Sequence, residues 1–141
     1  MIASEFIYDN IITGLTLSYP VYLGAAAHSG TNDNLPTSYI TLMDIGGSSN
    51  PAYLRDVYTV DFIGRFEKAE YEQGLLTMYA LRDGILGHPN IVDGSGNIWC
   101  QFLLTRAPQF TNIDGNGKTV ITMIFEVTVD SSSGTYRQSI Q

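Results

Sequence analysis

The sequence predicts an α+β fold, a two-layer sandwich in which two helices cover one face of a mainly antiparallel sheet, in the order α-β-β-β-α-β-β. Two observations lead to this prediction. Apolar residues recur at helical spacing in two segments, and they alternate with polar residues in several others. A length of 141 residues with 44% apolar content suits one core. We expect one domain over residues 1–130 and a flexible polar tail over residues 131–141.

The N-terminal half is expected to form one helix and three strands. Apolar residues from Phe6 to Leu15 recur at helical spacing and predict a helix over residues 3–15. Strands are predicted at residues 21–25, 39–45 and 53–66. The polar segments between them, residues 26–36 and 46–51, are rich in glycine, asparagine and serine, so both are predicted to be loops.

The C-terminal half is expected to form one helix and two strands. Three glutamates in the first turns predict a helix over residues 67–86, which Gly87 and Pro89 end. Its expected apolar face consists of Tyr71, Leu75, Leu76, Met78, Tyr79 and Leu86. Strands are predicted at residues 98–105 and 118–130, and in the second of these the odd-numbered residues from Ile121 to Val129 share one apolar face.

Composition and charge disfavour several classes of function. Acidic residues outnumber basic ones by 14 to 7, and no basic stripe exists to neutralise phosphates, so specific DNA or RNA binding is disfavoured. Cys100 is the only cysteine, and its apolar surroundings favour a small buried side chain rather than a zinc ligand. No segment approaches the ~20 apolar residues of a membrane span, and the N-terminus lacks the basic start of a signal peptide. We therefore expect synthesis in the cytoplasm and no membrane partner.

Two short motifs suggest ligand binding, but their surroundings favour turns. Gly117-Lys118-Thr119 matches the end of a phosphate-binding loop, yet Asn112 stands where the first glycine belongs and a strand pattern follows. Residues 112–117 match the start of a calcium-binding loop, yet Met123 stands at the position of the final glutamate. Neither His28 nor His88 has a partner at metal-ligand spacing. We predict no catalytic residue, no cofactor-binding residue, no metal ligand and no enzymatic activity.

One segment resembles a known family. Tyr58-Thr59-Val60-Asp61-Phe62-Ile63-Gly64, followed by the helix predicted at residues 67–86, resembles the strand-then-helix centre of tail terminator proteins of long-tailed bacteriophages. The resemblance extends over residues 3–130 and concerns element order, size and acidity. It implies a structural protein of the virion tail and neck, made in the host cytoplasm. Such a protein forms a homo-oligomeric ring, expected to be hexameric, that caps the tail tube and stops its polymerisation.

The resemblance also implies partners and candidate contact residues. The ring joins the tail tube protein to the head-side connector or stopper protein, and viral DNA passes through its lumen without specific binding, which the net acidity suits. The two predicted loops are the candidates for contacts between subunits or rings, by their position rather than by a family motif. Their candidate residues are Asn32, Asp33, Asn34, Leu35, Pro36, Ser48, Asn50 and Pro51.

Two alternatives remain open. Another neck, head-completion or tail-tube protein fits the same size and acidity, and a tube protein should polymerise where a terminator stops at a closed ring. A small ligand-binding or enzyme accessory domain belongs to a different class, and it requires a deep pocket with convergent polar groups.

Overall fold

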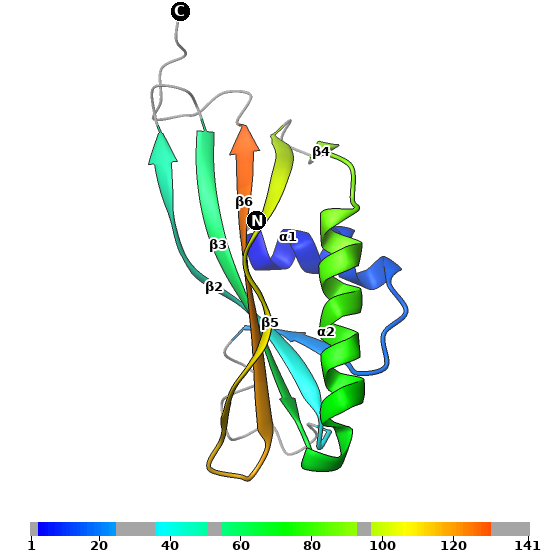
Figure 1. Cartoon of the computed structure of the whole chain (residues 1–141). Helices are drawn as coiled ribbons and strands as arrows, with labels where there is room; N and C mark the ends of the chain where they lie inside the picture. Colours follow the sequence, from blue (N-terminus) through cyan, green and yellow to red (C-terminus); the bar gives the residue numbers. More distant parts are fainter. Residues whose placement is uncertain (1–2, 25–35, 51–54, 93–96, 131–141) are drawn as a thin grey trace, which may run out of the picture.

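The computed structural model describes residues 3–24, 36–50, 55–92 and 97–130 (Figure 1). Expectations for the loop at residues 26–35, for the tail at residues 131–141 and for the side chain of Cys100 lie outside this description. The helices are α1 (Ala3–Asn10) and α2 (Tyr71–Leu86), with 3-10 turns at Ile12–Gly14 and Lys68–Glu70. The strands are β1 (Val21–Leu23), β2 (Tyr39–Asn50), β3 (Arg55–Phe66), β4 (Ile91–Val92), β5 (Ile98–Ile113) and β6 (Thr119–Asp130).

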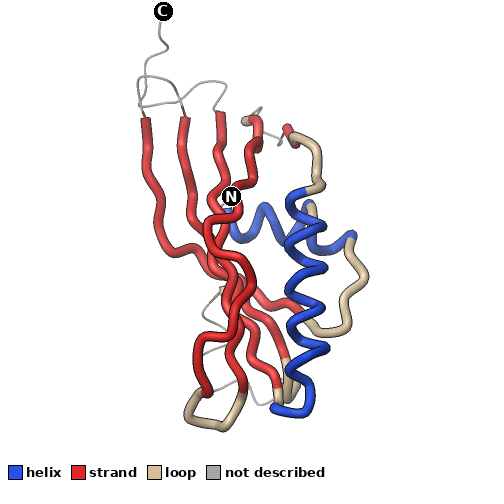
Figure 2. Tube along the Cα trace, viewed as in Figure 1, coloured by secondary structure: helices blue, strands red, loops and turns tan. Residues whose placement is uncertain are grey.

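The strands form one sheet in the order β1-β2-β3-β6-β5-β4. Every neighbouring pair is antiparallel except β1 with β2, which is parallel. The sheet is strongly twisted, and its left-to-right order of strands reverses from the top to the bottom of the view (Figure 2). The prediction of an α+β fold with two helices and a mostly antiparallel sheet is therefore confirmed. The short strand β4, which the sequence did not predict, follows α2 and adds one strand to the predicted order.

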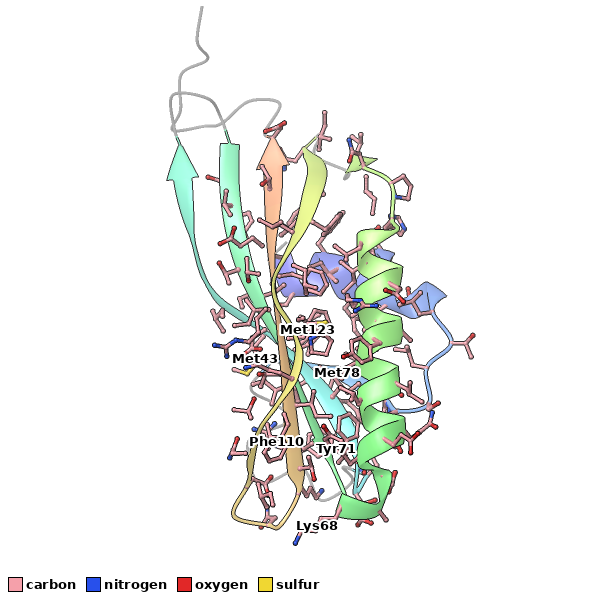
Figure 3. The ribbon with its side chains drawn as sticks, viewed as in Figure 1. Met43, Lys68, Tyr71, Met78, Phe110 and Met123 are labelled. Atoms are coloured by element: carbon pink, nitrogen blue, oxygen red, sulfur yellow. The ribbon has the colours of Figure 1, made fainter. Side chains whose placement is uncertain are left out.

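The core lies between the helices and one face of the two central strands. β3 and β6 pair without a register shift from Arg55 opposite Asp130 to Phe66 opposite Thr119, so their alternating residues stay in step. The apolar face predicted for residues 121–129 is confirmed, because Ile121, Met123, Phe125, Val127 and Val129 are all buried. On β3, Val60, Phe62 and Phe66 are buried as well, and Tyr58 is half-buried. α2 adds Met78, which points toward Met123 (Figure 3).

Two residues in the first turns of α1, Ser4 and Phe6, hold the helix against the sheet. The carboxylate of Asp44 on β2 accepts hydrogen bonds from the backbone N–H and the hydroxyl of Ser4. This places a negative charge at the positive N-terminal end of the helix. The ring of Phe6 stacks on Trp99 of β5, with 3.9 Å between the ring centroids. α1 therefore bridges the two halves of the sheet, although it ends at Asn10 and the chain continues as a 3-10 turn instead of the predicted longer helix.

Two predicted strand ends were wrong. β2 continues to Asn50 and β5 continues to Ile113, so residues 46–50 form a strand rather than a loop. Gly46 and Gly47, which suggested a turn, lie within the paired part of β2. Gly46 has a positive φ of 134° beside a β-bulge, and a Cβ at Gly47 would lie 2.3 Å from the carbonyl oxygen of Val57. Both features need glycine within a paired strand.

The predicted apolar face of α2 was also wrong in part. The helix buries Gly74, Thr77, Met78, Leu81 and Ile85, whereas Leu76 is 54% exposed. Gly74 faces the sheet because it has no side chain, which lets the helix approach the ring of Phe66 closely. With Gly74 turned toward the sheet, Leu76 lies on the outer side of the helix. No helix among the described residues has the length and apolar character needed to span a bilayer.

Candidate assembly surfaces

The segments that resembled ligand-binding loops form a turn between β5 and β6. One carboxylate oxygen of Asp114 accepts hydrogen bonds from the backbone N–H groups of Asn116, at 2.9 Å, and Lys118, at 3.0 Å. Gly117 has a φ of 78°, and the chain then enters β6 at Thr119. These bonds use the Asp114 oxygen for the turn itself. Within the described ranges, no three His, Cys, Asp or Glu side chains are placed to hold a metal ion.

Two shallow depressions lie beside the segment that joins α1 to β1. The larger, of about 230 Å³, is lined by Tyr8, Ile12, Thr13, Leu15, Leu17, Tyr19, Pro20 and Val21. The smaller, of about 100 Å³, lies between residues 16–18 and α2. Both are smaller than the ~300–1,000 Å³ of typical ligand pockets. Burial and the carboxylate of Glu70 raise the pKa of Tyr19 to about 12, so this phenol stays neutral at physiological pH.

The structure places only some of the predicted contact residues. Pro36, Ser48 and Asn50 fall within the described residues, whereas Asn32, Asp33, Asn34, Leu35 and Pro51 lie outside them. Pro36 precedes the start of β2, and Asn50 is the last residue of the same strand. Ser48 pairs with Val57 of β3, and Asn50 pairs with Arg55. Ser48 and Asn50 therefore lie near the C-terminal end of β2, whereas Pro36 lies just before its N-terminal end.

Among the described residues, β2 has a strand neighbour on its outer side only at residues 40–42, and the rest of this side is called its open edge. β1 pairs with residues 40–42 alone, and the N–H of Gly24 then bonds the carbonyl of Leu42 at 2.8 Å. Beyond that point, no strand of the described chain pairs with this side of residues 43–50. An open edge offers unpaired backbone donors and acceptors to another chain. Ile45, the bulged residue, is 49% exposed there.

β5 presents the second open edge, on the other side of the sheet. β4 pairs with Ile98 and Trp99, and no other described strand borders this side of β5. The register of β5 against β6 shifts at four places, and Pro108 lies within the strand. Bulges and proline are typical of edges that do not template regular strand pairing. A long regular backbone ladder along this side of β5 is therefore disfavoured.

The large exposed apolar side chains lie mainly on α2, β4 and β5, and those of β5 are on both faces of the sheet: Leu103 lies opposite Glu126 and Phe110 opposite Ile121. Among the residues that the structure describes, Ile45 of β2 is one of nine such side chains, and the other eight belong to these three elements. They are Tyr71, Leu76, Leu86, Val92, Ile98, Leu103, Phe110 and Ile113. Tyr71 and Phe110 form an edge-to-face pair with 6.4 Å between their centroids (Figure 3). Single exposed apolar residues are normal, whereas exposed aromatic residues such as this pair are enriched at protein interfaces.

The charges are distributed unevenly along the sequence, although three basic residues border β2: Arg55 pairs with Asn50, Arg65 pairs with Tyr39, and the ammonium of Lys118 lies over the Tyr39 ring. Residues 1–54 contain no lysine or arginine, and their described acids are Glu5, Asp9 and Asp44. Arg106 is the only basic residue of β5; it is exposed, and within the described residues it forms no ion pair. Asp61 of β3 and Arg106 of β5 both pair with Ile124 of β6, so the three residues form one row across the sheet. Burial raises the pKa of Asp61, and the charge of Arg106 partly opposes this rise. One carboxylate oxygen of Asp61 is buried without a hydrogen-bond partner.

No protein-family model matches this chain, and no curated protein is significantly similar to it. Sequence reasoning located the strands but missed both open edges. Alternation shows that a segment is a strand with two different faces, whereas an edge depends on which strands are neighbours. The signal that could have pointed to the β5 edge was Pro108 within the strand, since proline lacks the N–H that a central strand needs.

Proposed function

We propose that this chain is a structural virion protein, a tail terminator of a long-tailed bacteriophage, and that it has no enzymatic activity. Its copies form a closed ring, with six subunits by the family resemblance, on the last ring of the tail tube. The ring stops polymerisation of the tube and joins it to the head-side connector or stopper protein. Viral DNA passes through the lumen without specific binding.

The observation that carries this proposal is the pair of open sheet edges. A cyclic ring needs two different surfaces on each subunit, because each copy contacts one neighbour through one surface and the next neighbour through the other. β2 and β5 lie on opposite sides of the sheet at the top of Figure 1, and each borders a strand of two or three residues that covers only part of it. One subunit therefore has two lateral surfaces available for association.

The element order and the charge give further support. β3 ends at Phe66 and α2 begins at Tyr71, which agrees with the strand-then-helix centre on which the resemblance rests. In the proposed subunit the sheet forms one layer and the two helices form the other, as a two-layer sandwich. The formal net charge of −7 disfavours DNA adhesion within a narrow lumen, because like charges repel.

A tail-tube protein is the second candidate, since the same two edges would also serve a subunit that adds repeatedly along an axis. The two candidates differ in how assembly ends. A terminator closes into rings that do not stack without limit, whereas a tube subunit continues into filaments.

Light scattering over a wide range of protein concentration, with negative-stain images of the same samples, tests the proposal. We expect the mass to reach a plateau near six subunits and the images to show rings with a central hole. Filaments whose length grows with concentration would assign the chain to the tail tube instead. A monomer at every concentration, together with failure to bind isolated tail tubes, would contradict both candidates.

A further inference from the structure

We infer that residues 135–141 bind along the open edge of β2 in their own chain, as an added antiparallel strand. The docking site is residues 46–50, the part of this edge that lies beyond the β-bulge at Ile45. This binding does not depend on the ring proposed above. It goes beyond that proposal because it names what covers the β2 edge of a free subunit, which a neighbouring subunit would have to displace in order to contact this edge.

Residues 46–50 form a regular edge that lacks the usual protection against pairing. They pair with β3 without a register shift, from Gly46 opposite Thr59 to Asn50 opposite Arg55. Their sequence, Gly-Gly-Ser-Ser-Asn, contains neither a charge nor a proline, and these are two of the devices by which exposed edges avoid further pairing. Among the described residues, no strand pairs with their outer side. Such an edge accepts an extended segment through backbone hydrogen bonds.

The direction of the chain after β6 suits antiparallel pairing with β2. Asn50 and Asp130 both pair with Arg55, so β2 and β6 end in the same cross-strand row. Figure 1 shows their arrowheads at the same end of the sheet. A segment that turns back after Asp130 therefore runs opposite to β2, as an antiparallel strand must.

The length of the chain after Asp130 also suits this path. From β6 to the position outside β2, the segment crosses three strand spacings, or about 14 Å. Five Cα steps, from Asp130 to Thr135, reach up to about 17 Å when the chain is extended. Residues 131–134, Ser-Ser-Ser-Gly, are therefore long enough for the crossing, and their composition is typical of a connection. Residues 135–141 then remain to pair with residues 46–50.

The sequence of residues 135–141 is compatible with an added strand. It reads Thr-Tyr-Arg-Gln-Ser-Ile-Gln and contains neither proline nor glycine, whereas threonine, tyrosine and isoleucine are enriched in strands. Side chains alternate between the two faces of a strand, so Tyr136 and Ile140 would share one face with Gln138 between them. The two large apolar side chains of the segment therefore fall on the same side.

The β5 edge is the competing site, and three features disfavour it. β4 pairs with Ile98 and Trp99, and Ile98 is opposite Asp130, so the end of β5 nearest to the departing chain is already covered. β5 is antiparallel to β6, so a segment that turns back after Asp130 would run parallel to β5, and parallel pairing is slightly less stable. The register shifts of β5 and Pro108 also interrupt any regular ladder.

Two adjacent prolines in the full chain test the inference. Arg137→Pro combined with Gln138→Pro removes two successive backbone N–H groups, and one of the two would face β2, because successive residues of a strand point their N–H groups to opposite sides. Arg137→Ala combined with Gln138→Ala is the matched control, because it truncates the same side chains and keeps both N–H groups.

Hydrogen exchange read by mass spectrometry gives the result, at a protein concentration at which sedimentation velocity shows monomers. In the unaltered chain and in the alanine variant, we expect the amides of residues 46–50 that do not bond β3 to be protected. In the proline variant the same amides should exchange at least tenfold faster. Residues 102–110 of β5 should exchange equally in all three proteins, and unchanged exchange in β3 and β6 verifies that the fold is intact.

Three results would overturn the inference. Equal exchange of residues 46–50 in the proline and alanine variants would show that residues 135–141 do not pair with β2. Faster exchange of residues 102–110 in the proline variant would place the segment on the β5 edge instead. Protection of residues 46–50 that appears only where the chain forms oligomers would assign the added strand to a neighbouring copy. The mass of the assembled species decides the proposed ring separately, because none of these exchange results depends on it.

Discussion

The ring of Phe66 lies so close to Gly74 that a Cβ added at Gly74 would be 2.5 Å from Cγ of Phe66. On its other side the ring meets Gly64, where an added Cβ would be 2.4 Å from Cε2. Phe66 is fully buried, and it ends the central strand β3 just before the chain turns into α2. The contact between Phe66 and Gly74 therefore fixes the distance between α2 and the sheet.

Gly74→Ala is expected to destabilise the fold by about 1–3 kcal/mol, because the ring, which Gly64 confines on its other side, cannot move away. The sign is informative, since alanine in a helix interior is otherwise favoured over glycine by about 1 kcal/mol. Denaturant unfolding followed by circular dichroism measures the difference.

The matched control for this substitution is Gly84→Ala in the same helix. A Cβ at Gly84 would meet only the terminal methyl groups of Leu15, at 2.7 Å, and this flexible side chain can move. We expect no loss of stability, or a small gain. Equal losses for the two substitutions would show that the close approach of Gly74 does not determine the packing of α2.

Gly47→Ala is expected to weaken the β2–β3 hairpin. An added Cβ would lie 2.3 Å from the carbonyl oxygen of Val57, which is backbone of the neighbouring strand and cannot rotate away. Gly115→Ala, at a turn position with no heavy atom within 4 Å of the added Cβ, is the control. Hydrogen exchange should accelerate in β2 and β3 for the first variant alone. Unchanged exchange in β2 would contradict the strand assignment of residues 46–50.

Asp44→Ala is expected to loosen α1 more than Ser4→Ala does. The alanine at position 44 removes both hydrogen bonds to Ser4 and the charge at the helix N-terminus, at a cost of about 0.5–2 kcal/mol for the lost cap. The alanine at position 4 leaves the bond from the backbone N–H in place. Unfolding midpoints and the fluorescence of Trp99, which stacks on Phe6, measure both effects. A larger effect of Ser4→Ala would contradict the role assigned to the carboxylate.

Asp61→Asn is expected to stabilise the protein at neutral pH. Burial raises the pKa of Asp61 and the charge of Arg106 opposes part of this rise, so the folded protein disfavours the ionised form. The stability associated with a raised pKa is fully present below the unfolded value of 3.8 and is lost as the pH rises through the folded value. The advantage of the amide should therefore be largest at pH 7 and should shrink toward pH 3. A stability difference that does not change between these pH values would refute this account.

The sequence predicted the central strands well because both are regular and half-buried. In β6 the alternation from Ile121 to Val129 matches the buried face residue by residue. Residues 46–50 were wrongly predicted to be a loop because glycine is typical of turns. In the structure Gly46 permits a bulge and Gly47 permits a close approach to Val57. The buried face of α2 was predicted wrongly in part because the side toward the sheet is set by the close approach of Gly74 to Phe66 rather than by hydrophobicity. Gly74 therefore faces the sheet and Leu76 does not.

The candidate surfaces were much less predictable than the strands. An open edge depends on the strand order β1-β2-β3-β6-β5-β4, which places the last two long strands between β3 and β4, and no local pattern encodes that order. The predicted contact residues Ser48 and Asn50 lie in β2, because residues 46–50, which were predicted to be part of a loop, form a strand. Their role in assembly stays a prediction, as do the phage partners and the absence of catalysis.

The most direct test of the ring is the number of subunits in the assembled species, counted by native mass spectrometry across a hundredfold range of protein concentration. We predict a single closed oligomer of six copies, whose population rises with concentration while its mass stays constant. A continuous ladder of oligomers that lengthens with concentration, or a monomer throughout, would contradict a subunit that closes into a ring.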